Sequence, residues 1–301
     1  ESLALPTLSR PSLPSLFNSV SRYLLPALVV AAFFLIWQFL PPALGIPTYE
    51  LPNLSQTITG LQQDWSEIGV GILVTMQDAL VGFLIGNGLA ILGATTFAYS
   101  RTMERAFYPV AILVQTIPII VYVPLLAILF DKVPGLDANS DASAVIGVAV
   151  LITFFPTLVN MTAGFKEVDP RVFEFMTLLN ASKTEIFLKL RFPSALPFLF
   201  SSLKITSTLA FVGAIVGEWM AGAGLNPIGQ ILSQAGVHSL LGFDTNPANA
   251  GGIGNLLNLF YYNVDKPGLF ASVFAVSILS MLAFGVIVLL QKLVVPWDAS
   301  R

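Results

Sequence analysis

Residues 166–193 read KEVDPRVFEFMTLLNASKTEIFLKLRFP and separate two long apolar stretches of the chain. The chain has 14 basic and 17 acidic residues, and nine of these 31 lie between positions 166 and 191. Because the bilayer core excludes charged side chains, this segment must lie in water, against headgroups or against a soluble partner. We interpret it as an element that docks onto a partner; a solvated loop is the alternative.

The composition of the whole chain is that of a membrane protein. Charged residues make up 10% of it, against about 25% in soluble domains, and hydrophobic residues make up 55%. The mean hydropathy is +0.81. The absence of cysteine excludes disulfides and thiolate sites, and the single His238 excludes a multi-histidine metal site. No phosphate-binding loop or catalytic cluster is present, so we expect no catalytic site, no metal and no nucleic-acid partner.

Six stretches are long and apolar enough to span a bilayer, which takes about 20 residues. They lie at about 23–42, 70–98, 106–130, 143–165, 196–221 and 268–291. The predicted fold class is therefore an all-α polytopic membrane protein with six transmembrane helices in one domain, residues 23–295. Residues 1–22, rich in serine and proline, are expected to be an N-terminal cytoplasmic lead. Pro118 and Pro124 are expected to kink the third span.

The distribution of basic residues predicts the orientation. If the N-terminus is cytoplasmic, twelve of the fourteen lysine and arginine residues fall in cytoplasmic segments, and only Lys132 and Lys266 fall outside. Basic residues favour the cytoplasmic side of membrane proteins. We therefore expect a multi-pass protein of the inner (plasma) membrane with both termini in the cytoplasm.

The first half of the charged segment has the signals of a short helix. Asp169-Pro170 fits a helix start, with aspartate as N-cap and proline in the first turn. Residues 171–180 then form the helix. Asn180-Ala181-Ser182 is expected to end it, because asparagine tolerates a left-handed backbone conformation.

The second half has the signals of another helix. Ser182 and Glu185 have the spacing of a capping box. Apolar residues, Phe187 among them, alternate with basic residues along this helix, and Pro193 is expected to end it. The segment therefore predicts a helix–turn–helix on the cytoplasmic side.

This pattern resembles the cytoplasmic coupling loop of permease subunits in binding-protein-dependent ABC importers. That loop carries Glu-Ala-Ala, then a glycine, and farther on an apolar residue and a proline. Here Glu174-Phe175-Met176 stands in place of Glu-Ala-Ala, Asn180 in place of glycine, and Phe192-Pro193 closes the motif. Phe175 and Met176 are bulkier than alanine and would need a roomier socket on the partner.

The resemblance implies a type I importer permease fold in which the loop 166–193 binds a separate ATPase subunit. ATP and Mg²⁺ would be held by that subunit, so no cofactor is expected on this chain. The other implied partners are a second permease copy, an external substrate-binding protein and membrane lipid. Glu174 would anchor the loop and Asn180 would shape its turn. The residues assigned to coupling in this way are Asp169, Glu174, Phe175, Met176, Asn180, Ala181, Ser182, Phe187 and Pro193.

Four further segments resemble the nitrate, sulfonate and taurine branch of the same family, which also includes bicarbonate permeases. They are Leu51–Ser55, Gln115–Pro118, Phe155–Asn160 and Gly213–Glu218. The resemblance implies import of a small anion such as nitrate, bicarbonate or a sulfonate, with a vitamin precursor as the alternative. Residues 225–250 have no counterpart in that branch and are interpreted as an outer insertion.

Polar or helix-breaking residues inside apolar spans are candidates for the transport pathway. Backbone carbonyls freed by a proline could line a polar path, and a buried carboxylate could act as a gate. Ordinary helix packing and helix-end roles are the alternatives. The candidates are Gln115, Thr116, Pro118, Thr208 and Glu218.

Two other functional classes remain open at this point. A secondary transporter would carry inverted repeats and ionisable relays near mid-membrane, which fit this sequence poorly. An integral membrane enzyme would need a catalytic cluster at the interface, and the sequence offers none.

Overall fold

The computed structural model describes residues 13–134, 140–221 and 251–297. The predicted outer insertion, residues 225–250, and the first twelve residues of the predicted lead lie outside these ranges. Within them the chain is helical and contains no β-strand, which confirms the all-α class. The elements are α1 (Leu13–Ala43), α2 (Leu54–Gln63), α3 (Trp65–Tyr99), α4 (Arg101–Gln115), α5 (Ile119–Phe130), α6 (Ser140–Gly164), α7 (Pro170–Leu178), α8 (Lys183–Ile186), a π-helical turn (Phe187–Arg191), α9 (Phe192–Ala221), α12 (Ile253–Tyr262) and α13 (Lys266–Val294).

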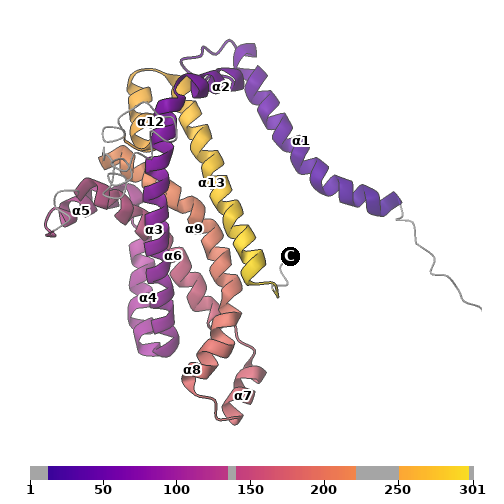
Figure 1. Ribbon diagram of the computed structural model, residues 1–301, viewed down its shortest axis with the longest axis vertical. Coiled ribbons are helices and arrows are strands. Elements are labelled where there is room, and N and C mark those ends of the chain that lie inside the picture. The colour runs from indigo at the N-terminus through magenta and orange to yellow at the C-terminus, as the bar shows by residue number, and fades with distance from the viewer. Residues whose placement is uncertain (1–12, 135–139, 222–250, 298–301) are drawn as a thin grey trace, which may run out of the picture.

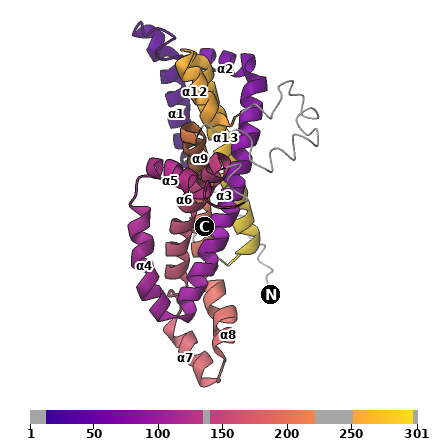
Figure 2. The same ribbon diagram turned by 90° about the vertical axis from the view of Figure 1, so that its left-hand side faces the viewer.

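Among the described residues, five helical segments are long and apolar enough to cross a membrane. They contain α1, α3, α6, α9 and α13. The predicted third span is not one straight helix, because α4 and α5 meet at an angle of 108°. The pair supplies the sixth span if both helices together cross the bilayer. α4 runs beside α3, while α5 turns away from the long axis of the bundle (Figures 1 and 2).

The break between α4 and α5 falls at Pro118, which caps α5 with an extended ψ of 131°. Proline lacks the N–H that would continue the helix and disfavours helical backbone at the residue before it. Pro124 lies inside α5 without ending it. The predicted kink is therefore concentrated at the first proline alone.

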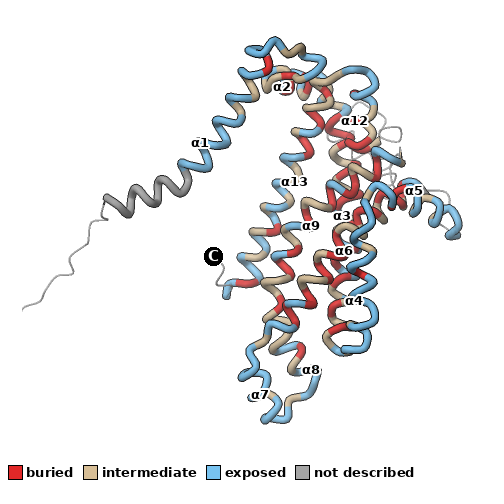
Figure 3. The backbone as a smooth tube through the Cα atoms, turned by 180° about the vertical axis from the view of Figure 1, so that it is seen from behind, coloured by how far each residue is buried: buried red, intermediate tan, exposed pale blue. Residues whose placement is uncertain are grey.

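The core of the bundle is α6, which packs against α3 on one side and α9 on the other. Ala149 of α6 lies between two glycines, Gly82 of α3 and Gly213 of α9. A β-carbon on Gly213 would come within 2.9 Å of the Ala149 Cα, so glycine is what permits this close approach. Figure 3 shows the buried residues concentrated on these three helices.

A buried polar contact joins the same three helices farther along the bundle. The amide oxygen of Asn87 on α3 accepts hydrogen bonds from the hydroxyls of Thr157 on α6 and Thr206 on α9. The Asn87 amide nitrogen donates to the Phe83 carbonyl at 2.7 Å. Because each group has a partner, this contact fixes the helices without leaving a polar atom exposed to lipid.

α1 diverges from the bundle and meets it only near the end where α2 lies (Figure 1). Its described side chains are mostly exposed, as the pale blue tube in Figure 3 shows. Phe34 and Trp37 form edge contacts with Phe274 of α13, and the Trp37 indole donates to the Pro52 carbonyl at 3.0 Å. α1 begins at Leu13, ten residues before the predicted span.

Residues 169–191, which we call the charged hairpin, protrude from the end of the bundle opposite α2 and α12 (Figures 1 and 2). The predicted end of its second helix at Pro193 is wrong. α8 continues through the π-helical turn into α9, which contains Pro193 and Pro197. The Phe192 N–H donates to the carbonyl of Phe187 five residues back, and this wider turn gives the proline ring room that a regular turn would not.

Candidate functional site

Local capping bonds fix the first helix of the charged hairpin. The Asp169 carboxylate accepts a hydrogen bond from the Arg171 N–H at 2.8 Å, and Pro170 occupies the first turn. At the other end Asn180 has a positive φ of 53°. The N–H groups of Asn180 and Ala181 donate to the carbonyls of Thr177 and Met176, the two bonds of a Schellman motif. The predicted cap and left-handed turn are confirmed.

The second helix of the hairpin begins with the predicted capping box. The Ser182 N–H donates to the Glu185 carboxylate at 2.9 Å, and the Glu185 N–H donates to the Ser182 hydroxyl at 3.2 Å. Phe187 is buried against the rings of Tyr99 and Phe165. It therefore attaches the hairpin to the bundle, and any contribution to a docking surface is indirect.

The outer part of the charged hairpin carries large apolar side chains that no other described part of the chain covers. Leu178 is 81% exposed, and Phe175, Leu179 and Leu188 are each more than half exposed. Glu174 is exposed beside them. A rigid element with apolar side chains in a polar setting has the character of an interface.

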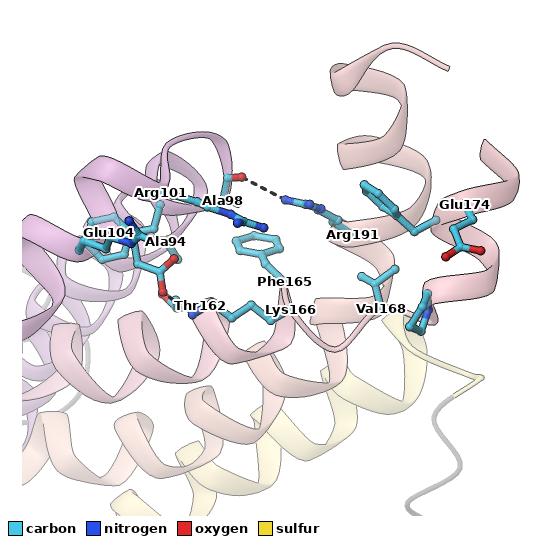
Figure 4. A pocket seen from close by; sticks show the side chains of 14 residues that line it. Ala94, Ala98, Arg101, Glu104, Thr162, Phe165, Lys166, Val168, Glu174 and Arg191 are labelled. Atoms are coloured by element: carbon cyan, nitrogen blue, oxygen red, sulfur yellow. Dashed lines mark hydrogen bonds and ion pairs between the residues drawn. The ribbon is translucent and has the colours of Figure 1, made fainter. Parts of the chain in front are cut away.

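A cavity of about 650 Å³ lies between the charged hairpin and the adjoining ends of α3, α4 and α6 (Figure 4). Four cationic residues line it, and we call it the basic cavity. The Lys166 ammonium pairs with Glu104, and the Arg191 guanidinium donates to the Ala98 carbonyl at 3.0 Å. Arg191 also lies 5.6 Å from the centre of the Phe173 ring. The cationic residues are Arg101, Arg105, Lys166 and Arg191.

Glu218 lies at the opposite end of the bundle and is fully buried. Its Oε2 accepts hydrogen bonds from the Thr75 hydroxyl at 2.9 Å and from the Gly254 N–H at 2.8 Å. The Thr75 oxygen in turn accepts from the Ile253 N–H at 2.8 Å. Glu218 therefore gives the N–H groups at the start of α12 a hydrogen-bond acceptor, and the start of a helix is a favourable site for an acidic side chain.

The other pathway candidates lie at the bend between α4 and α5. Gln115 lines a cavity of about 280 Å³ together with Tyr122 and mostly apolar residues of α5, α6 and α9. The Thr116 hydroxyl donates to the Leu113 carbonyl of its own helix. Thr208 on α9 likewise bonds its own helix, at the Ile205 carbonyl, although its neighbour Leu209 lines the cavity.

The structure therefore divides the predicted pathway residues between two places. Gln115, Thr116 and Pro118 lie at the bend, with Thr208 on the neighbouring helix. Glu218 is not among the residues that line this cavity. Its contacts hold α12 against α3 and α9.

The sequence of the chain matches that of a known family over most of the bundle. The family is described as "Binding-protein-dependent transport system inner membrane component", and the match covers residues 86–297. The chain belongs to this family of ABC importer permeases. It is a transport subunit, and the predicted resemblance is confirmed at the level of the family.

Curated relatives of this permease have different solutes in their names. The formylaminopyrimidine transport permease protein ThiX of Halalkalibacterium halodurans is 28% identical, over 92% of this chain and 96% of its own. The riboflavin transport system permease protein RibX of Chloroflexus aurantiacus is 25% identical, over 94% and 95%. The nitrate import permease protein NrtB of Synechococcus elongatus is 24% identical, over 69% and 75%.

A solved structure has the same fold. A chain from the crystal structure of a bacterial ABC transporter involved in the import of the acidic polysaccharide alginate aligns with a TM-score of 0.54. The alignment covers 93% of this permease and 99% of that chain, at 13% identity. The likeness supports the permease fold and carries no information on the solute.

Two features of these sites escaped the sequence reasoning. The partners of Glu218, Thr75 and Gly254, are 143 and 36 residues away in the chain, so no local pattern joins them. The basic cavity draws its cations from three separate segments. The only sign of this cavity in the sequence was the pair Arg101 and Arg105 before an apolar stretch. That pair had been interpreted as evidence for the orientation of the chain in the membrane.

Proposed function

We propose that this chain is the membrane subunit of an ATP-driven importer and that its charged hairpin binds a separate ATPase subunit. The observation that carries this proposal is the exposed apolar surface of the hairpin, with Leu178 81% exposed at its outer end. Both helices of the hairpin are rigidly capped, so the surface has a fixed shape. A partner that covers it removes apolar area from water, which stabilises the complex by roughly 25 cal/mol per Å².

The connections of the hairpin suit it to transmit movement. Phe187 packs in an aromatic cluster, Arg191 bonds the end of α3, and the π-helical turn continues into α9. Movement of the hairpin would therefore displace α9, whose far end holds α12 through Glu218. ATP binding would close the ATPase pair and open the pathway outward, and hydrolysis would reset it.

The assembly that follows from this proposal has two permease copies, two ATPase subunits and an external binding protein. A second copy would lie against α5, where Leu125, Ile128 and Leu129 are more than half exposed. The charged hairpin would face the cytoplasm, as would both termini, in the inner membrane. α2 and α12 would then lie at the outer face, where the binding protein docks.

For the solute, we propose a compact organic heterocycle such as a vitamin precursor. The cavity at the bend has Gln115 and Tyr122 as its polar residues, and the rest of its lining is apolar. Among the described residues, the buried acidic or basic side chains are Asp78 and Glu218, so no buried cation is available to bind an anion. Two relatives that match over more than 90% of the chain are named for formylaminopyrimidine and riboflavin.

A small anion is the second candidate, and the nitrate permease relative favours it. Uptake into vesicles containing the complete importer separates the two. We expect ATP-dependent accumulation of an aminopyrimidine, reduced by Gln115→Leu. Accumulation of nitrate with no competition from the pyrimidine would overturn the heterocycle proposal.

Glu174→Lys tests the coupling proposal. The reversed charge beside Phe175 should release the ATPase subunits from the purified complex while the permease stays folded in detergent. Glu167→Lys is the matched control, because Glu167 is also exposed but precedes the hairpin. Retention of the ATPase and of transport in Glu174→Lys would count against this surface as the docking site.

A further inference from the structure

We propose that the basic cavity binds the phosphate headgroup of an anionic phospholipid from the adjoining leaflet. The cavity contains four cations and two carboxylates, Glu104 and Glu174. Lys166 pairs with Glu104, which leaves more positive than negative charge around a space of about 650 Å³. Cations that share a cavity repel one another, and an anion between them removes that repulsion.

Arg101 and Arg105 are the cations that remain available. In the part of the chain that the structure describes, neither forms a salt bridge. Both are exposed and lie one turn apart at the start of α4. Arg191 approaches the cavity from the hairpin side, as Figure 4 shows, and its position is fixed by Ala98 and Phe173. Guanidinium groups suit the oxygens of a phosphate because they donate two parallel hydrogen bonds.

The position of the cavity indicates a lipid rather than a free ion. It lies where α3, α4 and α6 end and the charged hairpin begins, which is the level of the headgroups if the hairpin is outside the bilayer (Figures 1 and 4). An apolar stripe leads away from it along α4. Pro109, Ile112 and Leu113 follow Arg105 by four, seven and eight residues, on the same side of the helix, and all three are exposed. An acyl chain could lie along this stripe while the headgroup occupies the cavity.

The proposed orientation of the chain decides only which leaflet supplies the lipid. A lipid in this site would bridge α4, α6 and the charged hairpin, so it would favour one position of the hairpin relative to the bundle. The lipid composition would then affect how efficiently ATP hydrolysis is coupled to transport. Juxtamembrane basic clusters generally attract anionic lipid in this way.

The test measures lipid binding to the purified full-length chain, without ATP, by native mass spectrometry. The probe is phosphatidylglycerol, with phosphatidylcholine as the neutral comparison. The double variant Arg101→Gln/Arg105→Gln should weaken phosphatidylglycerol binding roughly thirtyfold and leave phosphatidylcholine binding unchanged. The matched control is Lys183→Gln/Lys189→Gln, which removes two positive charges from the hairpin outside the cavity and should have little effect.

Four results would overturn the proposal. Equal loss of binding in the control would mean general surface attraction. Displacement of the lipid by millimolar inorganic phosphate would mean a free-anion site, and loss of the lipid when the ATPase subunit is added would assign the cavity to that subunit. Arg101→Lys/Arg105→Lys keeps the charge but loses the paired guanidinium donors, so its binding should lie between that of the unchanged chain and that of the glutamine variant. Binding no tighter than that of the glutamine variant, in a folded chain, would also contradict the proposal. Because transport is not measured, the outcome is independent of the proposed solute.

Discussion

Glu218 is the residue on which the outer end of the bundle depends. Its carboxylate is fully buried, contacts Gly252, and bonds Thr75 and Gly254. Its other oxygen, Oε1, has no hydrogen-bond partner among the described residues. A buried carboxylate is expensive unless the site gives it compensating donors, and here the start of α12 provides them.

Removal of this carboxylate should therefore detach α12. Glu218→Ala leaves the Gly254 N–H and the Thr75 hydroxyl without an acceptor, at a cost of about 1–3 kcal/mol for each buried group. We expect a lower midpoint of thermal unfolding and faster hydrogen exchange in residues 253–262. Glu218→Gln should retain most of the stability. Thr208→Val is the control, because its hydroxyl bonds only its own helix.

Asn180 is the residue that allows the charged hairpin to turn. Its φ of 53° is tolerated by asparagine and glycine and is strained for branched side chains. Asn180→Gly should preserve ATPase binding, whereas Asn180→Val should weaken the turn by about 1–2 kcal/mol and reduce binding. Limited proteolysis between residues 170 and 192 measures this change. Equal resistance of both variants would contradict the role of the turn.

The residue scale also shows where sequence reasoning works. The caps at Asp169 and Ser182 and the turn at Asn180 were predictable because each depends on atoms within a few residues. The surroundings of Glu218 were not, because they depend on how α3 and α12 pack against α9. The position of Glu218 in an apolar span indicated a special site, but only the folded structure identifies its hydrogen-bond partners.

At the level of the elements, glycine decides how closely the central helices approach. Gly213→Ala would place a methyl group 2.9 Å from the Ala149 Cα, so α9 would have to move away from α6. Such overpacking typically costs about 1–3 kcal/mol. Gly88→Ala is the matched control, since nothing lies within 4 Å of the added carbon. Thermal unfolding in detergent should separate the two variants, and equal midpoints would show that α9 adjusts freely.

The prolines show why helix boundaries were harder to predict than helices. Pro118 and Pro124 lie inside an apolar span and Pro193 ends the charged segment, and the sequence gives no reason to rank their effects on the helices. The break occurs at Pro118, where the chain changes direction by 108°. The helix continues through Pro193 because the π-helical turn before it removes the steric conflict. The π-helical turn begins at Phe187, whose ring lies against Tyr99 of α3, a contact between residues far apart in the sequence.

At the level of the whole molecule, the two ends of the bundle have different characters. One end carries the charged hairpin and the basic cavity, and the other carries α2 and α12. The excess of basic residues at the hairpin end predicts that it faces the cytoplasm. The number and approximate positions of the spans followed from hydropathy, and the kink in the third span followed from its prolines. The divergence of α1 followed from neither.

The orientation can be tested directly because the chain has no cysteine. Single cysteines can be introduced at Thr184, exposed on the charged hairpin, and at Tyr262, which is 78% exposed at the end of α12. A membrane-impermeant maleimide should label Tyr262→Cys in intact cells and label Thr184→Cys only after lysis. The reverse pattern would place the hairpin outside the cell, where no ATPase subunit could bind it, and would exclude the proposed coupling.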